Sequence, residues 1–89
     1  MKRAHVLYAG RVQGVGFRFN TVEIANRYGI VGLVKNCGDG RVEVVAEGTE
    51  PSLQSFLDEL NASMSQFIRD RQISWAPASN QFSSFQINY

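Results

Sequence analysis

A glycine-containing segment between a strand-like stretch and a helix-like stretch most constrains the fold of this 89-residue chain. Residues 5–9 are rich in apolar side chains and run into Gly10, which predicts a strand. From residue 17, apolar side chains recur at helical spacing as far as residue 28, and Gly29 follows, as is typical just past a helix end. The chain therefore begins with a strand, a glycine loop and a helix.

The middle of the chain predicts a hairpin followed by a second helix. Residues 30–36 and 41–47 have the composition of strands, and the Asp39-Gly40 pair between them indicates a tight turn. Pro51 suits the first turn of a helix, and apolar residues from Leu53 to Phe67 then repeat at steps of three and four. This amphipathic pattern is the most regular in the sequence.

The tail predicts a short strand at residues 72–76 and a closing strand at residues 82–87. The order of elements is then βαββαβ with one possible extra strand. This order is typical of an α+β, ferredoxin-like sandwich, in which two helices cover one face of an antiparallel sheet of four to five strands.

The glycine loop is also a candidate anion site. Gly14 and Gly16 can adopt backbone angles closed to other residues, so the loop can turn its N–H groups toward an anion. Arg18 adds a guanidinium at the start of a helix, where unpaired N–H groups and the helix dipole favour phosphate. An ordinary turn explains the loop equally well when the loop is considered alone.

Asn36 is expected to join Arg18. Two strands connected through a helix crossover run parallel, so the strands at residues 5–9 and 30–36 should end at the same edge of the sheet. Arg18 follows the first of these strands through the loop, and Asn36 ends the second. The topology therefore predicts that the two side chains lie close together.

Residues 10–18 (GRVQGVGFR) and 32–36 (GLVKN) resemble the two signature segments of acylphosphatases. The similarity extends to Asp39-Gly40, to residues 42–48 and to residues 82–87, so we expect residues 1–89 to form a single acylphosphatase-like domain.

The resemblance implies metal-independent hydrolysis of the carboxyl-phosphate bond of an acyl phosphate, giving a carboxylate and inorganic phosphate without a cofactor. It implies that Arg18 and Asn36 are the catalytic residues, with Asn36 orienting the attacking water. The implied phosphate-binding residues are Gln13, Gly14, Val15, Gly16, Phe17 and Arg18.

Composition excludes several other classes of protein. A single cysteine, Cys37, and a single histidine, His5, leave no internal disulfide and no Cys/His cluster for zinc. A net charge of +1 with scattered basic residues argues against nucleic-acid binding. No apolar run is long enough to span a membrane and no secretory segment is present, so we expect a cytoplasmic monomer with no nucleic-acid or membrane partner.

Two other interpretations remain open from the sequence. One is a non-catalytic phosphate- or partner-binding ferredoxin-like module, and the other is a domain excised from a larger carbamoyl-phosphate-processing protein. His5 is interpreted as a half-exposed strand residue without a role, and Cys37 as an inert thiol.

Overall fold

The computed structural model describes residues 1–89 as five strands and two helices around one core. The strands are β1 (Lys2–Gly10), β2 (Val31–Asn36), β3 (Val42–Gly48), β4 (Ile68–Pro77) and β5 (Phe85–Ile87). The helices are α1 (Phe17–Arg27) and α2 (Glu50–Ser63). Neither helix has the length and apolar character needed to cross a membrane.

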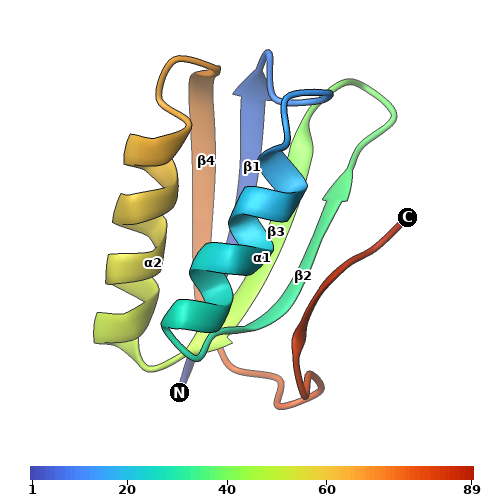
Figure 1. Ribbon diagram of the computed structural model, residues 1–89. Helices are drawn as coiled ribbons and strands as arrows, with labels where there is room; N and C mark the ends of the chain where they lie inside the picture. Colours follow the sequence, from blue (N-terminus) through green and yellow to red (C-terminus); the bar gives the residue numbers. More distant parts are fainter.

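The sheet has the strand order β4-β1-β3-β2-β5, and both helices lie against one face of it (Figure 1). Strand β3 pairs antiparallel with β1 on one side and with β2 on the other, and β1 also pairs antiparallel with β4. The ferredoxin-like α+β fold is confirmed. The sheet is nevertheless mixed rather than wholly antiparallel, because the chain crosses to the outer edge of β2 after β4 and β5 then pairs parallel with β2.

Several predicted boundaries differ from the structure. Strand β1 spans Lys2–Gly10 rather than residues 5–9, and three elements further along the chain also differ. The apolar pattern of the second helix continues to Phe67, but α2 ends at Ser63, and Met64 closes it by donating its N–H to the Leu60 carbonyl. Strand β4 spans ten residues rather than residues 72–76, because it pairs along the whole of β1. Strand β5 is shorter than residues 82–87.

Alternation of side chains places the core between the helices and the sheet. In β1 and β3 every second residue is buried toward the helices, and α2 contributes four buried side chains at helical spacing. These residues are Ala4, Val6, Tyr8, Val42, Val44, Ala46, Leu53, Phe56, Leu57 and Leu60. Strand β1 is therefore held by strands on both sides and by packing on one face, which gives the loop that follows it a rigid base.

Glu47 anchors the connection between β4 and β5. Its carboxylate is 2% exposed and accepts hydrogen bonds from the N–H and hydroxyl of Ser79, at 2.8 and 2.7 Å, and from the N–H of Asn80, at 3.1 Å. Arg3 on β1 lies 3.8 Å from the same carboxylate. One buried side chain of β3 thus fixes the path by which the chain reaches β5.

Candidate active site

The loop between β1 and α1 is held at three points. Val12 is buried in the core, and Phe17 is buried against Tyr8 of β1, with ring centroids 5.0 Å apart. Between them, the side-chain amide of Gln13 donates to the carbonyls of Cys37 and Arg41, at 2.8 and 2.9 Å. The loop is therefore fixed to the sheet below it and to the turn between β2 and β3 beside it (Figure 1).

Burial raises the pKa of Tyr8 to about 12, although the positive charge of Arg71 acts in the opposite direction. The phenol is therefore neutral at physiological pH, and Tyr8 supports the base of the loop as a packing residue. The buried hydroxyl of Thr21 is satisfied within α1, because it donates to the Phe17 carbonyl at 2.7 Å.

Two glycines give the loop its shape. Gly14 has φ +77° and Gly16, which caps the N-terminus of α1, has φ +80°. Both angles lie in the left-handed region that favours glycine, and a Cβ at either position would meet no atom within 4 Å. The glycines are therefore required for backbone conformation, and the space beside them is open.

The N–H groups of this loop are free to bind a ligand. Arg11 donates its N–H to the Phe67 carbonyl, but the N–H groups of residues 12–16 donate to no backbone carbonyl. Those of Phe17, Arg18 and Phe19 lie in the first turn of α1, where no residue of the helix can accept them. A row of donors at the positive end of a helix is a site for an anion.

A cavity of about 190 Å³ opens above these donors, with room for about six water molecules at ~30 Å³ each. Its lining brings together the loop, the start of α1 and the end of β2, and consists of Val12, Gly14, Gly16, Phe17, Arg18, Phe19 and Asn36. The Oδ1 atom of Asn36 is buried without a hydrogen-bond partner. The cavity therefore brings the Arg18 cation close to an amide side chain whose acceptor has no partner within the protein.

The Arg18 side chain has a neighbour from the end of the chain. The ring of Tyr89 lies over the guanidinium, with the Arg18 Cζ atom 5.2 Å from the ring centroid. This arrangement is a cation–π contact, which restricts the directions in which Arg18 can point while leaving its N–H donors unpaired.

The structure brings most of the sequence-predicted residues to this cavity, and Arg18 and Asn36 line it together. Gln13 and Val15 do not line it: the Gln13 side chain binds the β2–β3 turn, and Val15 packs against the core. Sequence reasoning missed Val12 and Phe19. The available signal for Phe19 was its place two residues after Phe17, because residues i and i+2 of a helix lie on different faces. The structure leaves Phe19 68% exposed in the first turn of α1.

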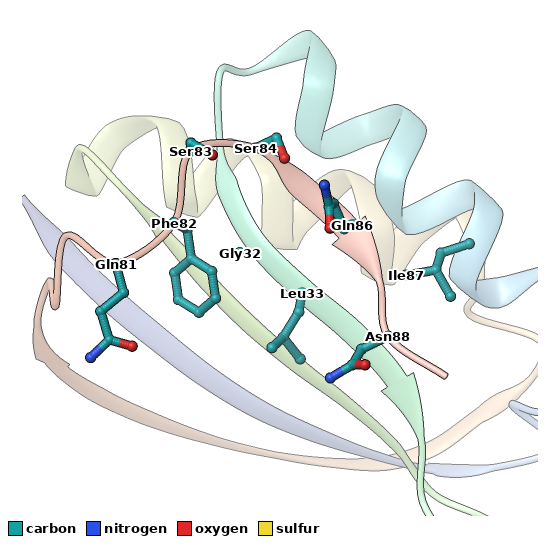
Figure 2. Close-up of a pocket in the computed structure, with 9 residues that line it drawn as sticks. All are labelled: Gly32, Leu33, Gln81, Phe82, Ser83, Ser84, Gln86, Ile87 and Asn88. Carbon is teal, nitrogen blue, oxygen red and sulfur yellow. The ribbon is translucent and has the colours of Figure 1, made fainter.

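A second cavity, of about 340 Å³, lies between β2 and the C-terminal segment (Figure 2). Its side chains are polar and uncharged or apolar, among them Gln81, Phe82, Ser83 and Leu33. It contains neither a cation nor a run of free N–H groups at a helix start, which an anion requires. The smaller cavity at Arg18 is therefore the better candidate for a charged ligand.

His5 and Cys37 lie outside the Arg18 cavity. The His5 Nε2 atom lies 2.5 Å from Glu43, on the face of the sheet away from the helices, and Lys35 approaches the same carboxylate at 3.5 Å. The hydrogen bond with His5 lowers the pKa of Glu43 despite partial burial. No group of three or more His, Cys, Asp or Glu side chains is arranged to hold a metal ion.

Fold and site together define a ferredoxin-like α+β domain with an anion-sized cavity at the start of its first helix. The family model described as acylphosphatase matches residues 4–87. This chain belongs to the acylphosphatase family.

Individual relatives agree with this assignment. An acylphosphatase of Clostridium acetobutylicum is 38% identical over 91 residues, covering 100% of this chain and 99% of that protein. An acylphosphatase of Nostoc is 51% identical over 55 residues, which cover 62% of this chain and 54% of that protein. The crystal structure of acylphosphatase from Bacillus subtilis superimposes with a TM-score of 0.90 at 34% identity and covers 100% of both chains.

Proposed function

We propose that this protein hydrolyses acyl phosphates to a carboxylate and inorganic phosphate, with residues 1–89 acting as one domain. The observation that carries the proposal is the joint lining of one small cavity by Arg18, by loop glycines with free N–H groups, and by Asn36 with its unpartnered Oδ1. Membership of the acylphosphatase family and the names of the relatives support the same reaction.

Binding of the phosphoryl group is assigned to the loop and Arg18. The N–H groups of residues 13–18 and the guanidinium donate hydrogen bonds to the phosphoryl oxygens, while the helix dipole adds a partial positive charge. Because the loop is already fixed at Val12, Gln13 and Phe17, its donors need little rearrangement when charge develops in the transition state.

Asn36 orients the attacking water in this mechanism. Its Oδ1 accepts a hydrogen bond from the water, but an amide is not a base near neutral pH, so the proton passes to a phosphoryl oxygen of the substrate. A carboxylate, whose conjugate acid has a pKa of about 4, departs without a general acid. Phosphoryl transfer then depends on positioning and charge stabilisation, which this site can supply.

The test is hydrolysis of acetyl phosphate and benzoyl phosphate by the wild type and by Arg18→Ala and Asn36→Ala. Each substitution should lower kcat/KM by on the order of 100-fold or more, by analogy with the removal of one transition-state donor. Arg18→Ala should also abolish competitive inhibition by inorganic phosphate, whereas Asn36→Ala should retain it and lose turnover.

Arg11→Ala is the matched control, because Arg11 belongs to the same loop but does not line the cavity. Its kcat/KM should stay within about threefold of the wild-type value. Inhibition or binding by phosphate without hydrolysis in the folded wild type would select the non-catalytic binding module instead.

A further inference from the structure

An apolar groove lies beside the phosphoryl cavity. It runs between α1 and β5, has a volume of about 570 Å³, and takes its apolar surface from Phe19, Val22, Phe85 and Ile87. Figure 2 shows Ile87 extending from β5 toward α1. Phe19 lines both this groove and the cavity that contains Arg18, so the two spaces meet at one side chain.

Phe19 has no structural role that explains its position. It is 68% exposed, whereas Phe17, two residues earlier, is buried against Tyr8. An exposed aromatic ring is unfavourable in water unless something covers it, and large exposed apolar surfaces commonly mark binding sites. Since Phe19 and Arg18 line the same cavity, whatever covers the ring lies near a group bound at the guanidinium.

The lining of the groove favours an uncharged ligand group over a negatively charged one. Glu23 of α1 lines it, and this carboxylate has no cation within ion-pairing distance. The remaining polar lining consists of the amide side chains of Asn26 and Gln86. A second negative charge in the groove would meet an uncompensated carboxylate, while an uncharged group would not.

We propose that the groove between α1 and β5 binds the acyl part of the substrate, with Phe19 as a specificity-determining residue and with uncharged aryl or branched alkyl acyl groups as the preferred class. The proposal rests on the proposed function. An acyl phosphate held by its phosphoryl group at Arg18 can extend its acyl part from the cavity into the groove, because Phe19 lines both spaces where they meet. The acyl group covers the exposed ring and gains apolar contact with Val22 and Ile87.

The experiment compares benzoyl, acetyl and succinyl phosphates as substrates for the wild type and for Phe19→Ala. For benzoyl phosphate the substitution should raise KM roughly 3- to 10-fold with kcat nearly unchanged, because contact with the acyl group is present in both the ground state and the transition state. For acetyl phosphate, which is too short to lie along the groove, KM should change by less than about twofold.

Three further variants sharpen the test. Phe19→Leu retains an apolar side chain and should recover part of the benzoyl phosphate affinity. Trp75→Ala removes another partly exposed aromatic ring, on β4 and outside both spaces, and should leave all three KM values unchanged. Glu23→Gln should lower KM for succinyl phosphate, which carries a free carboxylate, relative to benzoyl phosphate.

An equal change in KM for benzoyl and acetyl phosphates in Phe19→Ala would overturn the proposal. So would an unchanged KM accompanied by a shift in the sedimentation coefficient, which would assign the groove to contact between copies of the chain. Failure of the wild type to hydrolyse any of the three substrates would refute the proposed function itself, which is a separate outcome.

Discussion

At the scale of single residues, Gln13 fixes the loop to the turn between β2 and β3. Its side-chain amide uses both N–H donors on the carbonyls of Cys37 and Arg41. Cys37 follows Asn36 directly, so the hydrogen bond to its carbonyl joins the loop that holds Arg18 to the strand end that holds Asn36. The relative placement of the two candidate catalytic side chains therefore depends on a residue that does not line the cavity.

Gln13→Ala should lower the free energy of unfolding by about 1–2 kcal/mol, because two partly buried hydrogen bonds are lost. Phosphate affinity should fall on the order of 3- to 10-fold, since the loop must then be ordered on binding. Urea denaturation and phosphate inhibition measure the two effects. Gln54→Ala, at an exposed position of α2, is the control and should change neither quantity; an unchanged phosphate affinity in Gln13→Ala would contradict this role.

Residue chemistry explains which parts of the site could be predicted from the sequence. Arg18 and Asn36 were predictable because one lies at the start of α1 and the other at the end of β2, and the order of elements brings these two ends together. The structure has both residues lining one cavity. The bonds of the Gln13 side chain were not predictable, since a glutamine can bind carbonyls anywhere within reach and the two it binds lie 24 and 28 residues away. Phe19 lines the groove as well as the cavity because β5 lies beside α1. No local sequence pattern indicates that β5 pairs with β2.

At the scale of elements, α1 is bounded by glycines in the same conformation. Gly16 begins it with φ +80° and Gly29 follows its end with φ +66°, and a Cβ at either position would meet open space. The two positions therefore share one steric requirement, although only Gly16 lines the cavity.

Alanine at Gly16 or at Gly29 should cost about 1–2 kcal/mol of stability in each case, the strain of placing a side chain in the left-handed region. Only Gly16→Ala should also lower kcat/KM, by about tenfold or more, because its methyl group and the strained backbone disturb the donors around the phosphoryl group. Chemical denaturation and acetyl phosphate hydrolysis, measured on both variants, separate the effects. Equal loss of activity in the two would show that strain alone is responsible.

Elements were predictable where local pattern and tertiary packing agree. The apolar residues of α2 that repeat at helical spacing are the ones that the structure buries, so the helix and its start near Pro51 were predictable from the sequence. Its end was not, because Met64 remains buried after the helix has ended and continues the same apolar spacing. Strand β4 was predicted too short because Arg69, Asp70 and Arg71 carry no strand pattern; pairing with β1 determines their conformation.

At the scale of the whole molecule, Glu47 couples the stability of the fold to pH. Burial raises the pKa of its carboxyl, but the hydrogen bonds from Ser79 and Asn80 and the charge of Arg3 outweigh burial, and the pKa lies below its usual value. A carboxylate with a lowered pKa in the folded state stabilises the fold fully above its unfolded-state pKa of about 4.3. That stabilisation is lost as the pH falls through the folded-state value.

Glu47→Gln should therefore unfold at lower urea concentration at neutral pH, by on the order of 1–3 kcal/mol, since an amide cannot accept all the hydrogen bonds that the carboxylate accepts. Its stability should also depend less on pH than that of the wild type between about pH 3 and pH 7. Urea midpoints across this range provide the measurement. Glu50→Gln, which removes an exposed carboxylate at the start of α2 together with its ion pair with Lys2, is the control. Parallel pH curves for Glu47→Gln and the wild type would refute the coupling.

The position of β1 between β3 and β4 has a consequence for folding. This strand pairs with β3 and with β4, and the first residue of the loop after it is hydrogen-bonded to the Phe67 carbonyl, so the loop rests on segments that are distant in sequence. Closing such long separations slows folding, and the donors of the loop have their geometry only when these distant segments are in place. The phosphate binding proposed for this loop requires the folded chain, so added phosphate should withdraw chains from the unfolded population.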